Sequence, residues 1–139
     1  MDRPQMTPEE AARRVDANDW RPRNCVWELT LACNLRCRHC GSRAGEARTN
    51  ELTLEENLRV ADELAELGCE LVTLSGGEPT AKKGWDVLAQ RIRSHGVLVN
   101  MVTNGVYKDE ATAQDVALRA RDSGMSNVGM SIDGLEEVH

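Results

Sequence analysis

Three cysteines, Cys33, Cys37 and Cys40, lie close together in the sequence, with spacers of three and then two residues. This spacing allows three thiolates from one loop to converge on a metal centre. An iron–sulfur cluster usually takes four thiolates, so a trio leaves one iron without a protein ligand, as a catalytic centre requires. On the loop alone, a zinc site completed by His39 or by a distant cysteine is a second interpretation. Both interpretations predict a metal centre on this loop.

A second stretch that could bind a ligand is Gly76-Gly77-Glu78-Pro79. Two glycines permit positive φ and close approach of the backbone to a ligand, and Pro79 stiffens the exit from the turn. Glu78 adds a carboxylate, which suits a ligand that carries an ammonium group. Taken alone, Gly-Gly is more typical of a plain turn between a strand and a helix.

The composition favours metal chemistry in a reducing compartment. Five cysteines are an odd number and three of them are clustered, which argues against a disulfide framework. The net charge of −6 does not suit nucleic acid or an anionic membrane as a partner. No apolar run approaches the ~20 residues of a membrane span, and the polar N-terminus does not resemble a signal peptide. We therefore predict a cytoplasmic protein that binds neither nucleic acid nor membrane.

Strand and helix signals alternate around these motifs. Strands are predicted from β-prone apolar patterns at 25–31, 70–75, 97–103 and 127–132. Helices are predicted from capping boxes and apolar positions at a 3.6-residue period at 8–17, 54–67, 82–94 and 109–122. Strands joined by single helices imply right-handed crossovers and a parallel sheet, either open or curved as part of a barrel.

The unusual residues follow the predicted strands and do not precede them. The cysteine loop comes after the first strand and the glycine turn after the second, while residues 103–105 and 131–134 end the third and fourth. Ligands of such sheets lie at the carboxyl ends of the strands. One composite site at that rim is therefore predicted.

The other notable residues lie on the first strand or at strand starts. Glu28 and Thr30 share the face opposite Trp27, and this face would line the interior of a barrel. Because a buried, unpaired carboxylate is costly, Glu28 is expected to have a hydrogen-bonding partner or to lie near the ligand. Cys25 and Cys69, at strand starts, are expected to pack as small apolar residues.

Together the motifs resemble the radical S-adenosylmethionine (SAM) superfamily. CxxxCxxC after the first strand of a βα repeat is its signature, and Trp27-Glu28-Leu29-Thr30 is similar to the branch that modifies peptides or builds cofactors. The resemblance covers about residues 25–135. It implies an α/β fold with the first four strands of a (βα)6 TIM-like barrel. It also implies an N-terminal arm with a short helix over 1–24 and a partial radical SAM core domain over 25–139, truncated after the fourth strand.

The resemblance also implies roles for individual residues. Cys33, Cys37 and Cys40 would ligate a 4Fe-4S cluster, and the amino and carboxylate groups of SAM would chelate the fourth iron. His39 would lie against the adenine of SAM.

The remaining SAM contacts are implied at the ends of three strands. The backbone and the glutamate of residues 76–79 would engage the SAM amino group. Ser131, Asn104 and Asp133 would contact its ribose and carboxylate.

The implied reaction is reductive cleavage of SAM to methionine and a 5′-deoxyadenosyl radical, which takes a hydrogen atom from a ribosomal peptide or a cofactor precursor. A flavodoxin or ferredoxin type of protein would donate the electron, and no general base is needed. The family core has six βα units, so two alternatives are a non-catalytic iron–sulfur or SAM-binding fragment and one piece of a split enzyme. An open parallel edge would also favour self-association.

Overall fold

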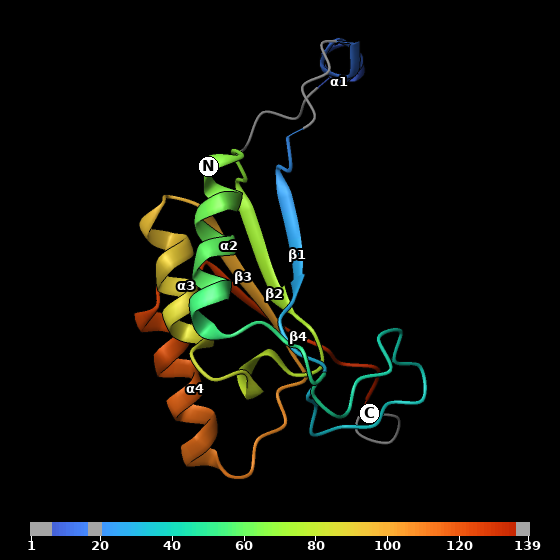
Figure 1. The fold of residues 1–139 in the computed structure, drawn as a ribbon. Coiled ribbons are helices and arrows are strands. Elements are labelled where there is room, and N and C mark those ends of the chain that lie inside the picture. Colours follow the sequence, from blue (N-terminus) through green and yellow to red (C-terminus); the bar gives the residue numbers. More distant parts are fainter. Residues whose placement is uncertain (1–6, 17–20, 136–139) are drawn as a thin grey trace.

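A computed structural model describes residues 7–16 and 21–135 and places four parallel strands in one sheet (Figure 1). The strands are β1 (Asn24–Glu28), β2 (Leu71–Ser75), β3 (Leu98–Thr103) and β4 (Asn127–Met130). Their order across the sheet, β1-β2-β3-β4, is also their order in the chain. Each crossover therefore moves one strand further in the same direction, so right-handed crossovers place their helices on one face. The predicted parallel βα repeat is confirmed.

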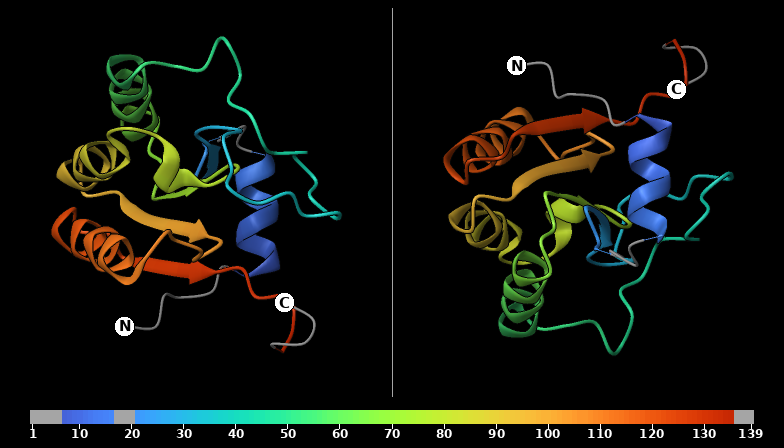
Figure 2. Two further views of the ribbon diagram at one scale, coloured as in Figure 1. Left: turned by 90° about the horizontal axis from the view of Figure 1, so that it is seen from below. Right: turned by 90° about the horizontal axis from the view of Figure 1, so that it is seen from above.

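Helices α2 (Leu54–Glu66), α3 (Trp85–Ser94) and α4 (Glu110–Asp122) cover one face of the sheet, as the views along the sheet make clear (Figure 2). Helix α1 (Pro8–Asp16) lies apart from them in Figure 1. Both predicted capping boxes are present, with Thr7 paired to Glu10 and Thr53 paired to Glu56. No helix in the described part of the chain has the length and hydrophobicity to cross a membrane.

Two predicted boundaries differ from the structure by three residues each. The helix expected from residue 82 begins at Trp85, because Pro79–Ala81 forms a short 3-10 helix, η1, and Gly84 takes a left-handed φ of 79°. The strand expected over 25–31 ends at Glu28. Beyond it, the carbonyls of Thr30 and Ala32 accept hydrogen bonds from the glycine turn, so this segment leaves the ladder of β2.

The core lies between the sheet and the helices. Its fully buried strand and helix residues include Val72, Leu74, Val99, Met101, Trp85, Leu88 and Ile92. Cys25 and Cys69 pack with this cluster, as predicted. The other face of the sheet is open, and Val26 on that face is 76% exposed. The helices thus hold the strands from one side and leave their opposite face and carboxyl ends accessible.

Candidate cofactor site

The carboxyl ends of the strands and the cysteine loop enclose a cavity of about 210 Å³. Its walls come from all four segments that the sequence singled out. The lining residues are Cys33, Leu35, Cys37, His39, Cys40, Ala44, Ser75, Gly76, Gly77, Val102, Thr103, Asn104, Ser131 and Asp133. The structure therefore brings together every predicted site residue except Glu78 and Pro79, which are buried and do not line the cavity.

The three clustered thiols are free, and hydrogen-bond donors point at two of them. The Leu35 amide donates to Cys33 Sγ at 3.4 Å, and the Ala44 amide donates to Cys40 Sγ at 3.3 Å. Such N–H groups stabilise thiolates and tune iron–sulfur clusters. Among the described residues, no three His, Cys, Asp or Glu side chains gather tightly enough to hold a single metal ion. The thiols instead line the wall of one cavity, a donor set that fits a cluster.

The cysteine loop is closed by contacts between its two arms. The Cys33 amide donates to the Gly45 carbonyl at 3.0 Å, and the Gly45 amide donates to the Leu31 carbonyl at 2.7 Å. The Arg36 guanidinium binds the Cys33 carbonyl at 2.8 Å and the Glu46 carboxylate at 2.9 Å. A Cβ atom at Gly45 would lie 2.8 Å from Arg36 Cζ, so a larger residue here would displace the guanidinium from these contacts. The cysteine loop is therefore stabilised by contacts between its own residues.

The glycine turn is tied to the chain that enters the cysteine loop. The Gly77 amide donates to the Thr30 carbonyl at 2.7 Å, and the Glu78 amide donates to the Ala32 carbonyl at 2.8 Å. A Cβ atom at Gly76 or at Gly77 would lie 2.3 Å from one of those carbonyl oxygens. The sequence suggested that these glycines admit a ligand. The structure adds a second reason, which is the close contact between the turn and the cysteine loop.

The Glu78 carboxylate does not line the cavity. It accepts hydrogen bonds from Thr80 Oγ1 at 2.6 Å, from Thr103 Oγ1 at 2.9 Å and from the Asn104 amide at 2.9 Å. Because Glu78 is only 3% exposed, these donors compensate for the burial of its charge. The predicted contact between Glu78 and the SAM amino group stays a prediction, whereas its link to the end of β3 is observed.

Asn104 lies between this link and the thiols. Its Nδ2 is 2.8 Å from Asn34 Oδ1 and 3.7 Å from Cys33 Sγ. His39 Nε2 is 3.4 Å from Asp133 Oδ2, which joins the cysteine loop to the segment after β4. The side chains of Asn104, after β3, and of Asp133, after β4, therefore contact the cysteine loop.

Glu28 has the hydrogen-bonding partners that its position on β1 requires. Its carboxylate accepts from Ser42 Oγ at 2.7 Å and from Arg48 Nη2 at 2.5 Å. The Ser42 hydroxyl and then the Arg48 guanidinium lower the pKa of Glu28 below its usual value. Glu28 on β1 thus binds the segment that follows Cys40, through Ser42 and Arg48.

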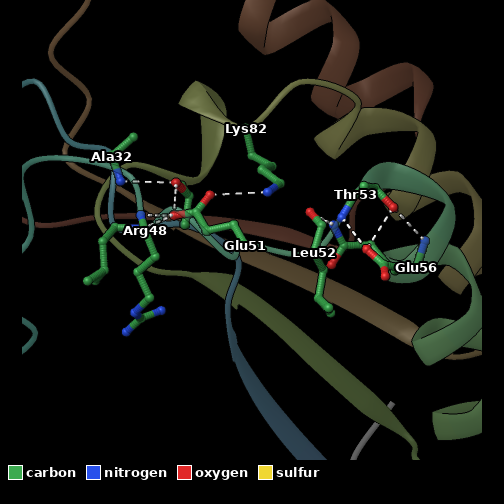
Figure 3. A network of polar contacts seen from close by, with 10 residues as sticks. Ala32, Arg48, Glu51, Leu52, Thr53, Glu56 and Lys82 are labelled. Carbon is green, nitrogen blue, oxygen red and sulfur yellow. Dashed lines mark hydrogen bonds and ion pairs between the residues drawn. The ribbon is translucent and has the colours of Figure 1, made fainter.

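Sequence reasoning missed Glu51, which lies at the centre of a partly buried polar network (Figure 3). Its Oε1 accepts hydrogen bonds from Thr30 Oγ1 and the Leu31 amide, both at 2.9 Å. Its Oε2 forms an ion pair with Lys82 Nζ at 3.1 Å. Burial raises the pKa of Glu51, but the donated hydrogen bonds outweigh this effect and lower the pKa to about 2. No motif or spacing marks this glutamate, so no sequence signal could have identified it.

Comparison with known proteins assigns the chain to a family. Residues 27–139 match the Radical SAM superfamily. The chain is 37% identical over 115 residues to Fe-coproporphyrin III synthase of Methanosarcina barkeri, covering 82% of this chain and 28% of that protein. It is 35% identical over 126 residues to the mycofactocin maturase MftC of Mycolicibacterium smegmatis, covering 91% of this chain and 30% of that protein. The chain thus spans about three tenths of the length of these relatives.

A solved structure supports the fold. Streptococcus suis SuiB bound to S-adenosylmethionine superposes with a TM-score of 0.61 at 23% identity, over 78% of this chain and 26% of that one. This likeness bears on the fold alone and agrees with the predicted partial barrel. By the match over residues 27–139, the chain belongs to the radical SAM superfamily, whose cofactors are a 4Fe-4S cluster and S-adenosylmethionine.

Proposed function

We propose that residues 25–139 are the cluster- and SAM-binding part of a radical SAM enzyme that modifies a peptide or a cofactor precursor, with residues 1–24 as a separate arm. The observation that carries this proposal is the single cavity lined by Cys33, Cys37, Cys40, the glycine turn and Asn104. A SAM-dependent enzyme of this class needs thiolates and a SAM pocket in contact, and this cavity offers both.

In this proposal the residues of the chain bind and orient. The three cysteines hold the cluster, and the amides of Leu35 and Ala44 stabilise two of the thiolates. The turn at Gly76 and Gly77 presents its backbone to the amino end of SAM. When bound, the cofactors would supply the carbon radical for hydrogen abstraction. The protein contributes position and the exclusion of water.

Asn104, Ser131 and His39 are proposed to hold the rest of SAM. All three line the cavity, on walls formed by the segments after β3 and β4 and by the cysteine loop. Their amide, hydroxyl and imidazole groups match the ribose, the carboxylate and the adenine of SAM in hydrogen-bonding or stacking capacity.

The substrate class rests on the relatives. One is named a maturase and another a porphyrin synthase, so both a peptide and a small-molecule precursor are consistent with the family branch. A flavodoxin or ferredoxin type of donor would supply the electron. We place the protein in the cytoplasm, where thiols stay reduced.

Anaerobic reconstitution with iron and sulfide tests the proposal. We expect bound iron and sulfide, visible iron–sulfur absorption and 5′-deoxyadenosine when SAM and a reductant are added. Cluster and SAM binding without 5′-deoxyadenosine would instead identify a non-catalytic fragment or one piece of a split enzyme. Retention of zinc with no sulfide would overturn the proposal.

A further inference from the structure

We propose that Glu51 and Lys82 are positioning residues, which hold the entrance of the cysteine loop in a fixed relation to the glycine turn and thereby set the thiols against the SAM pocket. This inference rests on the proposed function. It assigns to this partly buried ion pair a role in SAM binding, although neither side chain lines the cofactor cavity.

One carboxylate of the chain touches three separate segments. Glu51 accepts from Thr30 and Leu31, at the entrance of the cysteine loop, and from the Arg48 amide at 3.1 Å, near its exit. Its other oxygen is paired with Lys82, which directly follows η1 and so continues the glycine turn. Figure 3 shows these contacts converging on Glu51.

The segment held by Glu51 is held from the other side by the glycine turn. The carbonyls of Thr30 and Ala32 accept the amides of Gly77 and Glu78, while the Thr30 hydroxyl also accepts the Ala32 amide at 3.0 Å. Residues 30–32 therefore lie between the Glu51 carboxylate and the backbone of the turn. Cys33 is the next residue, so the position of its thiol depends on the position of residues 30–32.

Low exposure makes this arrangement specific. The side chains of Glu51 and Lys82 are only 11% and 16% exposed. Partial removal of a charge pair from water has a cost, which good geometry and further hydrogen bonds must offset. Helix α2 does not need Glu51 as a cap, because Thr53 and Glu56 form a complete capping box. The contacts of Glu51 thus serve the loop and the turn.

The test compares Glu51→Gln with a matched control, Asp62→Asn. Glu51→Gln keeps the side-chain volume but removes the charge and places an amide donor opposite Lys82. Asp62→Asn makes the same kind of change in an ion pair with Arg91 on the helical side, away from the cofactor cavity. The full chain is used throughout.

The first measurement is hydrogen exchange of residues 29–33 in the metal-free chain. We expect Glu51→Gln to speed exchange of the Leu31 amide by about tenfold, because a charge-assisted hydrogen bond is replaced by a weaker neutral one. Asp62→Asn should leave this segment unchanged. Equal protection of residues 29–33 from exchange in the wild type and in Glu51→Gln would show that Glu51 does not hold this segment and would overturn the proposal.

The second measurement is the dissociation constant of SAM for the reconstituted chain, read from the electron paramagnetic resonance of the reduced cluster. We expect Glu51→Gln to keep the iron and sulfide content of the wild type but to bind SAM about tenfold more weakly. A tenfold loss corresponds to a loop that is correctly placed about a tenth of the time. Unchanged SAM affinity despite faster exchange would make Glu51 a structural residue only. Equal weakening by Asp62→Asn would also overturn the proposal.

Two further results are decisive. If Glu51→Gln does not fold, Lys82→Met takes its place, with a smaller change expected in both readouts because the contacts to Thr30 and Leu31 stay. A Lys82→Met chain with wild-type exchange and wild-type SAM affinity would then refute the inference. A wild-type chain that takes up no cluster refutes the proposed function, and the positioning role with it, whereas a loaded wild type and an equally tight variant refute only the positioning role.

Discussion

Substitution of Gly77 by alanine should disrupt the contact between the glycine turn and the chain that enters the cysteine loop, on which the site depends. The added Cβ would lie 2.3 Å from the Ala32 carbonyl oxygen and 2.7 Å from that of Leu31, and both of these are backbone atoms. A separation of at least 3.0 Å is needed, so one segment must move by about 0.7 Å. Such a movement would strain or break the hydrogen bonds that Thr30 and Ala32 accept from the turn.

The cost follows from these two effects. Overpacking a tight contact costs about 1–3 kcal/mol, and each of the two weakened hydrogen bonds contributes about 0.5–1.5 kcal/mol. We therefore expect Gly77→Ala to lower the free energy of unfolding by about 2–6 kcal/mol. For a chain of this size, that corresponds to a fall in Tm of about 8–24 °C.

Urea unfolding of the metal-free chain, followed by circular dichroism, measures this loss. The control is Gly41→Ala on the cysteine loop, where a Cβ would meet no atom within 4 Å. We expect the control to unfold close to the wild type. Gly77→Ala with the same midpoint as Gly41→Ala would refute the close packing of turn and loop, and with it the frame of the site.

Three further predictions concern other carboxylates and the thiols. Glu78→Gln should lower the free energy of unfolding by about 1.5–3 kcal/mol, because a charged acceptor of buried donors is lost, whereas Glu46→Gln, at a side chain that is 93% exposed, should have almost no effect in the same urea titration. Hydrogen bonds from Arg91 and His95 hold the pKa of Asp62 below its usual 3.8. The stability that Asp62 contributes is therefore complete above that pH and is lost as the pH falls further. In Asp62→Asn the free energy of unfolding should fall less steeply at acid pH than in the wild type, and an unchanged pH dependence would count against this ion pair. Cys37→Ala should abolish the visible iron–sulfur absorption after reconstitution, while Cys69→Ala, at the opposite end of the sheet, should keep it.

Much of the frame could be predicted because its signals are local. The capping boxes at Thr7 and Thr53 fix two helix starts through contacts three residues apart, and alternation of apolar residues marks the strands. The rule that ligands lie at the carboxyl ends of parallel strands then brings Cys33 and Gly76 to one rim without knowledge of any distance.

What could not be predicted depends on contacts between distant residues. Glu51 meets Lys82 across 31 positions, and nothing in the spacing of either residue indicates that they pair. The hydrogen bonds of Glu78 come from Thr103 and Asn104, at the end of another strand. The sequence predicts a ligand contact for this carboxylate, which stays a prediction, and gives no sign of these bonds to the end of β3.

The central claim is that Cys33, Cys37 and Cys40 hold a cluster whose open iron takes SAM. The most direct test is the electron paramagnetic resonance spectrum of the reduced, reconstituted chain, recorded before and after SAM is added. We expect a 4Fe-4S signal that changes in shape on addition of SAM and is absent from Cys37→Ala. A cluster signal that SAM leaves unchanged, or no cluster signal from a folded chain, would contradict the claim.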